Sequence, residues 1–230
     1  KRLQKAFLKE PLAAHRLNRS YTYMTDCIIS CVWKISTRLL HPNTSINSLE
    51  HFSVLAVGGY GRGDMAPFSD IDLLFLSKNH LTRWMENVIE SMLYILWDLK
   101  LKVGHASRTV KECLRLGKED FTIRTAMLEL RFVEGNFFLS KELEDNLIGE
   151  LFKGTEQEFI DAKLRERDAR HKRQGGQRYM VEPNVKEGKG GLRDLHSLFW
   201  IAKYIHHVKT ISELVDLGLF RSEEHKIFAS

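Results

Sequence analysis

Hydrophobic positions along the first part of the chain follow two periods, which predict helices and strands in turn. The segment up to about residue 40 has the helical period, with apolar side chains at Ile28, Cys31, Val32 and Ile35. Two short, continuous apolar runs then predict buried strands at about 52–58 and 70–77. Residues 82–100 predict an amphipathic helix, because one face collects Met85, Val88, Ile89, Met92, Ile95, Leu96 and Leu99.

The pattern continues with a third strand at 101–110 and a stretch at 126–135 that fits either a fourth strand or a buried helix. Strands and helices that alternate at this spacing indicate a small mixed sheet. Beyond about residue 140 the chain is charged and helical, with a glycine-rich loop before further helices at about 195–208, 210–217 and 221–230. The expected fold class is α+β, a small mixed-sheet domain followed by an all-α helical domain.

We expect three parts in this fold: a helical segment at 1–45 that packs on the sheet domain, the sheet domain at 46–140, and the helical domain at 141–230. The chain begins without a methionine and stops within a predicted helix. It is therefore expected to be a fragment of a longer protein.

Charge and composition limit the partners more than they limit the fold. The net charge of +5 is compatible with phosphate-bearing partners but does not call for nucleic acid, because both signs are mixed along the chain. No apolar run approaches the roughly 20 residues that cross a bilayer, and no signal peptide is visible, so we expect a cytoplasmic protein without membrane partners. Cys27, Cys31 and Cys113 lack metal-binding spacing and predict core thiols of a reducing compartment.

Two carboxylates stand at the entry of the second predicted strand. Residues i and i+2 of a strand share a face, so Asp70 and Asp72 are expected to project together. Paired carboxylates repel each other unless a cation lies between them, and Mg²⁺ with oxygen ligands is the natural choice. The alternative is that one aspartate caps a turn and the other is solvated.

A glycine loop precedes this pair and favours the metal. Glycines allow phosphates to approach backbone N–H groups, and an arginine and a serine can add side-chain donors. The candidate nucleotide-binding residues are Gly58, Gly59, Gly61, Arg62 and Ser69. The spacing matches neither a P-loop nor a Rossmann glycine motif, so those two kinds of site are excluded.

A strand, two glycines and a D-x-D at the start of the next strand resemble the polymerase-β-type nucleotidyltransferase superfamily. More closely, GGYGRGDMAPFSDIDLLFL resembles the N-terminal catalytic domain of the bacterial bifunctional uridylyltransferase/uridylyl-removing enzymes, which modify the nitrogen-regulatory protein PII. That family's second signature, E-P-N-x-K-E-G-x-G-G-L-R-D-L, is matched from Glu182 to Leu195. Two specific motifs in the family's order extend the resemblance over nearly the whole chain.

The resemblance implies a Mg²⁺-dependent transfer of UMP from UTP to a tyrosine of PII, with release of pyrophosphate. Asp70 and Asp72 would hold the metal, and a third carboxylate would help bind metal or act as base. Glu129 stands where related nucleotidyltransferases carry an acidic residue before an arginine, with Asp120 as the alternative. Glu129 is equally compatible with a carboxylate that only pairs with an arginine. No residue of the sequence identifies the base of the nucleotide, so the expectation of uridine depends entirely on the resemblance.

The loop of the second signature offers cations beside a flexible backbone. Lys186 and Arg193 are expected to bind the nucleotide, while Asn184 and Asp194 orient them or cap the following helix. The alternative is a purely structural linker. The basic run before the loop favours a solvated helix face and comprises Arg165, Arg167, Arg170, Lys172 and Arg173.

The family's full enzyme continues into an HD-type hydrolase domain and two ACT domains. This chain contains no His-Asp dipeptide, so the uridylyl-removing activity and the sensor are expected to be absent from it. Three alternatives to PII uridylylation stay open: transfer to another acceptor such as an RNA end, a non-catalytic nucleotide-binding module of the same fold, and a fragment that binds UTP without turnover. The RNA alternative lacks support, because basic and aromatic residues are not interleaved.

Overall fold

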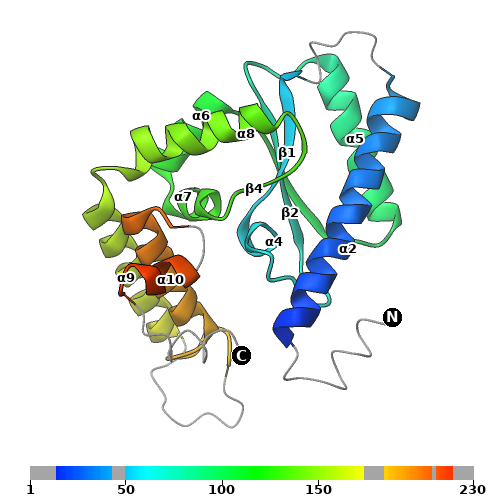
Figure 1. The fold of residues 1–230 in the computed structure, drawn as a ribbon. Coiled ribbons are helices and arrows are strands. Elements are labelled where there is room, and N and C mark those ends of the chain that lie inside the picture. Colours follow the sequence, from blue (N-terminus) through cyan, green and yellow to red (C-terminus); the bar gives the residue numbers. More distant parts are fainter. Residues whose placement is uncertain (1–13, 43–49, 174–183, 209–210, 220–230) are drawn as a thin grey trace. The chain divides into compact units, whose positions relative to one another are not determined.

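The computed structural model describes residues 14–42, 50–173, 184–208 and 211–219. They fall into two compact units, one that ends at Leu147 and one that begins at Ile148. Figure 1 labels the helices and strands of both units. The α+β class expected from the sequence is confirmed, since a small mixed sheet lies in the first unit.

The sheet of the first unit contains four strands among the described residues, in the order β3-β2-β1-β4. Strand β1 (Phe52–Ala56) pairs antiparallel with β2 (Ile71–Ser77) and with β4 (Arg131–Gly135). Strand β3 (Val103–Thr109) runs parallel to β2, which requires a crossover, and α5 (Arg83–Asp98) supplies it. The three predicted strands and the amphipathic helix are thus confirmed.

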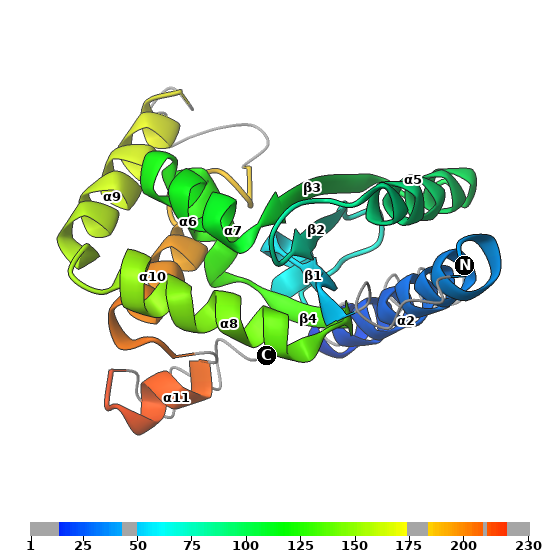
Figure 2. The same ribbon diagram turned by 90° about the horizontal axis from the view of Figure 1, so that it is seen from above.

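Helices cover both faces of this sheet. Figure 1 shows α2 (Ala14–Lys34) and α5 on one side, with α6 (Val110–Glu119), α7 (Phe121–Leu128) and α8 (Phe137–Asn146) on the other, and the view in Figure 2 agrees. The ambiguous stretch at 126–135 contains both alternatives, because α7 ends at Leu128 and β4 begins at Arg131. The first predicted helix continues from α2 into π-helical turns, η2 (Ile35–Leu40), and its residues 1–13 lie outside the described ones.

The main core lies between the sheet and the α2–α5 pair. It contains Ile29, Val32 and Trp33 of α2, Met85, Val88 and Met92 of α5, and Phe52, Val54, Ile71 and Phe75 of the sheet. The prediction of core thiols is right for Cys113 and wrong for Cys27 and Cys31, which are exposed. These two residues lie one turn apart and share a face of α2, but Ile29 and Val32 occupy the face that packs on the sheet.

The second unit is helical in its described residues. After the π-helical turns η3 (Leu147–Phe152), it contains α9 (Glu156–Arg173), α10 (Leu192–His206) and α11 (Ile211–Asp216). Helices α9 and α10 pack through Phe159 and Tyr204, whose rings stack with centroids 4.0 Å apart. The predicted helix at 221–230 lies outside the described residues. Within those that are described, no helix is both long and apolar enough to cross a membrane.

Candidate active site

Asp72 lies at the end of the sheet between two glycines. The N–H of Val57, just after β1, donates to the carbonyl oxygen of Asp72 at 3.1 Å, and on the other side Asp72 pairs with Gly104 of β3. A Cβ atom at Gly58 would lie 3.2 Å from one carboxylate oxygen of Asp72, and a Cβ at Gly104 would lie 2.6 Å from the other. A Cβ at Gly104 would thus overlap the carboxylate and one at Gly58 would crowd it, so glycine on both sides accommodates the side chain of Asp72 in this position.

Asp70 and Asp72 lie close enough for their charges to interact. Asp72 is half-buried and Asp70, one residue before β2, is exposed. Burial first, and then the negative charge of Asp70, raise the pKa of Asp72 above its ordinary value. Two carboxylates that repel each other at an open sheet end form a donor set suited to a hard divalent cation such as Mg²⁺.

The glycine turn, residues 58–65, begins directly after β1. It opens with the short helix α4 (Gly58–Arg62), where Gly58 has a φ of +57°, a conformation that favours glycine. Val57 at the N-cap makes no side-chain hydrogen bond to the helix. The first N–H groups of α4 are thus left without a side-chain cap, at the end of the sheet that carries Asp72.

Arg62 folds back over this turn rather than extending into solvent. Its Nε lies 2.7 Å from an Asp64 carboxylate oxygen, and its Nη1 lies 3.7 Å from a Glu129 carboxylate oxygen. A Cβ at Gly59 would come within 3.9 Å of Nη2 of Arg62, so the guanidinium lies near the first turn of α4. The guanidinium thus lies beside the first turn of α4, and its contact with phosphate stays a prediction.

Glu129 contacts Arg62 of the glycine turn, whereas Asp120 caps a helix. Glu129 is 2% exposed, and its carboxylate faces Arg62. Asp120 caps α7 by accepting hydrogen bonds from the N–H groups of Thr122 and Ile123, the first of which contributes most to lowering the pKa of Asp120. Among the described residues, no group of three His, Cys, Asp or Glu side chains could hold a metal ion. The metal role of Asp70 and Asp72, and of Glu129 as a third carboxylate, stays a prediction.

Ser69 closes the turn that precedes the two aspartates by making two hydrogen bonds with Ala66. Its N–H donates to the carbonyl oxygen of Ala66 at 3.1 Å, and its hydroxyl accepts the N–H of Ala66 at 3.1 Å. This turn has Pro67 at its second position and Phe68, with a φ of +72°, at its third. A type II turn favours glycine at that third position. Phe68 is nevertheless present, and its side chain is 77% exposed.

We expect Phe68→Gly to raise the free energy of unfolding by about 1 kcal/mol, because glycine adopts this φ without steric cost. Urea unfolding measures the change. Phe138→Gly is the matched control, since Phe138 is 80% exposed but lies in the helix α8, where replacing phenylalanine by glycine lowers stability by about 0.5 kcal/mol. A loss of stability in both variants would contradict the strained backbone at Phe68.

Several residues of this site were not predicted from the sequence. Gly104 makes room for Asp72, and a glycine inside a predicted strand was the available signal for such a close approach. Asp26 and Thr22 of α2 and Arg131 of β4 contact the glycine turn. Nothing local in the sequence marks these three.

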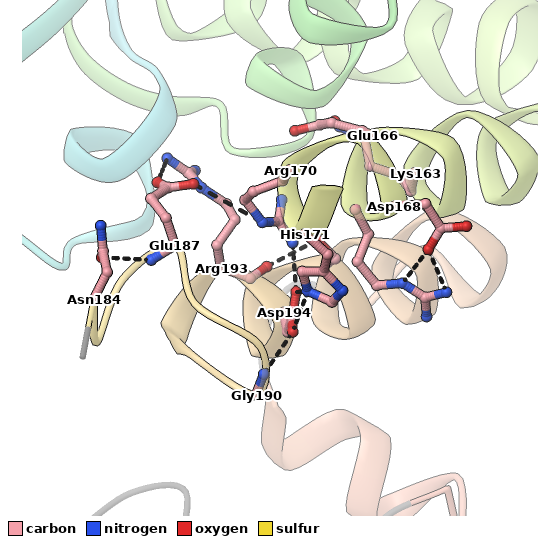
Figure 3. Close-up of polar contacts among 12 residues, drawn as sticks. Lys163, Glu166, Asp168, Arg170, His171, Asn184, Glu187, Gly190, Arg193 and Asp194 are labelled. Atoms are coloured by element: carbon pink, nitrogen blue, oxygen red, sulfur yellow. Dashed lines mark hydrogen bonds and ion pairs between the residues drawn. The ribbon is translucent and has the colours of Figure 1, made fainter. Parts of the chain in front are cut away.

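The loop of the second signature is held by Asp194 (Figure 3). The Asp194 carboxylate accepts hydrogen bonds from Arg170 and from the N–H of Gly190, and one of its oxygens lies 3.0 Å from Nε2 of His171. Burial opposes these bonds, but together they lower the pKa of Asp194 below its ordinary value. The expectation of a solvated basic face is wrong for Arg170, which is 4% exposed because its guanidinium turns inward to Asp194.

The glycines of this loop serve its own packing. The N–H groups of Leu192 and Arg193 donate to the carbonyl oxygens of Val185 and Lys186, both at 2.9 Å. A Cβ at Gly191 would lie 2.6 Å from the carbonyl oxygen of Val185. Unlike the glycine turn, this loop satisfies the first N–H groups of α10 itself and has no backbone donors there for phosphate.

The two cations predicted to bind nucleotide lie in this loop with different surroundings. Lys186 is exposed. Arg193 lies 3.5 Å from Glu187, and its guanidinium stands 5.8 Å from the centre of a Trp200 ring. Their role in nucleotide binding stays a prediction.

Comparison with known proteins matches both units. Residues 44–133 match the model of a nucleotidyltransferase domain, and residues 158–230 match the model of the GlnD PII-uridylyltransferase family. The chain is 60% identical over 226 residues to the bifunctional uridylyltransferase/uridylyl-removing enzyme of Ruegeria pomeroyi. The aligned residues are 98% of this chain and 25% of that protein. Proteins of the same description from Cereibacter sphaeroides and Erythrobacter litoralis are 56% and 49% identical, over 24% and 25% of their lengths.

The sheet, the glycine turn and Asp70–Asp72 thus lie in a nucleotidyltransferase domain. The chain belongs to the family of the bifunctional uridylyltransferase/uridylyl-removing enzymes, as the resemblance of its two motifs suggested. It spans about a quarter of the length of the curated relatives that it matches.

Proposed function

We propose that this chain transfers UMP from UTP to a tyrosine hydroxyl of PII, in the cytoplasm, with release of pyrophosphate. The observation that carries the proposal is the Asp72 carboxylate, held between Gly58 and Gly104 with Asp70 beside it. This pair stands next to a turn whose first N–H groups have no side-chain cap. Uridine and PII come from the names of the relatives, not from any residue of the site.

The acidic residues of the site would hold the metal, and its N–H groups and arginine would bind the phosphates. Asp70 and Asp72 would hold Mg²⁺, which supplies positive charge against the triphosphate and the departing pyrophosphate. The N–H groups of the glycine turn and the guanidinium of Arg62 would bind the phosphate oxygens of UTP. For Arg62 this contact requires exchange of its partner Asp64 for phosphate.

The acceptor hydroxyl would attack the α-phosphorus in line with the bridging oxygen of the pyrophosphate. A bond forms between the hydroxyl oxygen and the α-phosphorus, and the bond to the bridging oxygen breaks. The hydroxyl proton must pass to a base, for which Glu129 is the residue proposed from the sequence. Its contact with Arg62 supports a second role for Glu129, which is to hold that guanidinium over the turn.

The direct test is to mix the chain with PII, UTP and Mg²⁺ and to record the intact mass of PII. A uridylyl increment that depends on Mg²⁺ supports the proposal. ATP in place of UTP tests the base, and PII with its acceptor tyrosine changed to phenylalanine tests the acceptor. Binding of Mg–UTP by calorimetry without any increment would indicate a nucleotide-binding module instead of a transferase.

We expect Gly59→Ala to weaken the binding of Mg–UTP without lowering the stability of the fold. Its Cβ would meet only Arg62, at 3.9 Å, so the variant should fold at least as stably as the parent, with alanine favoured in α4 by up to about 1 kcal/mol. The methyl group would nevertheless stand at the turn that meets the phosphates, and we expect roughly tenfold weaker binding of Mg–UTP. Thermal unfolding and calorimetry measure the two effects. Unchanged affinity would count against phosphate binding at this turn.

A further inference from the structure

A carboxylate of helix α2 connects three elements that are far apart in the sequence. Asp26 accepts a hydrogen bond from the phenol of Tyr60, in α4, at 2.7 Å. The two terminal nitrogens of Arg131, in β4, donate to its two oxygens at 2.9 and 3.0 Å. This bidentate, charge-assisted contact fixes the orientation of the guanidinium as well as its position.

Arg131 also donates hydrogen bonds to the backbone of the glycine turn. Its Nη2 donates to the carbonyl oxygen of Tyr60 at 3.2 Å, and its Nε donates to that of Gly61 at 3.3 Å. The guanidinium also stands 5.2 Å from the centre of the Tyr60 ring. One side chain thus binds the last carbonyl oxygens of α4, where a cation is favoured.

Thr22 contacts the C-terminal end of the same turn. It lies one helical turn before Asp26. Its hydroxyl oxygen is 2.8 Å from the carbonyl oxygen of Gly63 and 2.9 Å from that of Asn18 in α2, so the single hydroxyl proton is shared between these two acceptors. The N–H of Met65 points to that hydroxyl at 3.4 Å. Thr22 is only 7% exposed, although α2 carries exposed residues on its other face. Residues i and i+4 of one helix face therefore contact the middle of the glycine turn, at Tyr60, and its C-terminal end, at Gly63 and Met65.

The glycine turn cannot hold its own shape. Helix α4 has five residues, far fewer than an isolated helix needs, and three of them are the glycines 58, 59 and 61. The aromatic side chain of α4, Tyr60, is fully buried. Burial, followed by the hydrogen bond to Asp26, raises the pKa of the Tyr60 phenol, which stays protonated and keeps donating to Asp26.

We propose that Thr22, Asp26 and Arg131, here named the α2 clamp, are positioning residues that preorganise the glycine turn for a nucleoside triphosphate. The identity of the bound group rests on the proposed function, whereas the ordering of the turn does not. The clamp touches only the backbone and Tyr60 of the turn, so it acts on ligand affinity through the position of the N–H groups.

The test uses an isosteric pair at Thr22 and a matched control on the same helix. Thr22→Val removes the hydroxyl and keeps the shape, whereas Thr22→Ser keeps the hydroxyl. Ser20→Ala removes a hydroxyl that bonds only within α2, to the carbonyl oxygen of Arg16. We expect Thr22→Val to raise the Kd of Mg–UTP roughly fivefold and to accelerate amide hydrogen exchange in residues 58–65 relative to β1 and β2. Thr22→Ser and Ser20→Ala should match the parent in both measurements.

The exchange measurement keeps the two proposals distinguishable. If the parent chain binds no Mg–UTP, the proposed function fails, while faster exchange at 58–65 in Thr22→Val still supports the clamp. If Thr22→Val lowers the Tm but leaves both the exchange of the turn and the Kd unchanged, the clamp is overturned and Thr22 has only a general packing role. Arg131→Lys tests the contact between Asp26 and Arg131, because lysine cannot reproduce its bidentate geometry. This variant should also raise the Kd of Mg–UTP.

Discussion

The double variant Asp70→Asn, Asp72→Asn is expected to lose transfer activity by roughly a thousandfold or more, because two neutral amides lack the negative charge that would hold Mg²⁺ against a triphosphate. Initial rates of UMP transfer to PII measure the loss. The matched control, Asp145→Asn with Asp168→Asn, neutralises two exposed carboxylates elsewhere and should retain parental rates. Full activity of the site variant would remove the basis of the proposed mechanism.

The same variant is expected to unfold at no lower temperature than the parent in metal-free buffer. A raised pKa means that the native state binds the Asp72 proton more tightly than the unfolded chain does. Native stability therefore falls as the pH rises through that pKa and Asp72 becomes ionised. Asparagine carries no charge, so the variant escapes this loss at neutral pH, and its lost activity could not be attributed to unfolding.

Mg²⁺ gives a readout that needs no acceptor. A cation that binds the native pair and not the unfolded chain stabilises by mass action, so the Tm of the parent should rise with the concentration of Mg²⁺. The double asparagine variant should show no such rise. Equal rises in both proteins would place the metal elsewhere in the chain.

Local patterns were enough to predict the elements that carry the aspartates. The apolar runs at β1 and β2 and the amphipathic face of α5 depend on residues adjacent in sequence, and the two-residue strand period brings Asp70 and Asp72 together. The exposure of Cys27 and the burial of Arg170 were missed for one physical reason. Which face of a helix is buried depends on its tertiary partners, here the sheet for α2 and Asp194 for Arg170.

The residues that support the site could not be predicted for a related reason. Asp26 contacts Tyr60 across 34 positions and Arg131 across 105, and no local motif encodes either pair. The glycines show how one residue type can serve different purposes. The sequence analysis assigned Gly58, Gly59 and Gly61 alike to phosphate approach, whereas the structure gives each a different neighbour: the Asp72 carboxylate, Arg62, and the backbone at Glu129.

Gly61→Ala is expected to lower the free energy of unfolding by roughly 3 kcal/mol, the largest stability effect in this site. Its Cβ would fall 1.7 Å from the carbonyl oxygen of Glu129 and 2.9 Å from that of Ala56. Both neighbours are backbone atoms, so no side-chain rotation can relieve the overlap. The turn would have to move away from β1 and from the α7–β4 junction together, and Arg62 would move with it.

Urea unfolding measures this loss, with Gly149→Ala as the control for the same chemical change. A Cβ at Gly149 meets nothing within 4 Å and this residue lies in the helical turns η3, so that variant should be at least as stable as the parent, with a gain of up to about 1 kcal/mol. Gly59→Ala adds a second comparison within α4, since there the added methyl group meets only Arg62. If Gly61→Ala unfolds like these two variants, α4 does not pack against Glu129. Its amides would then have no fixed position from which to bind phosphate.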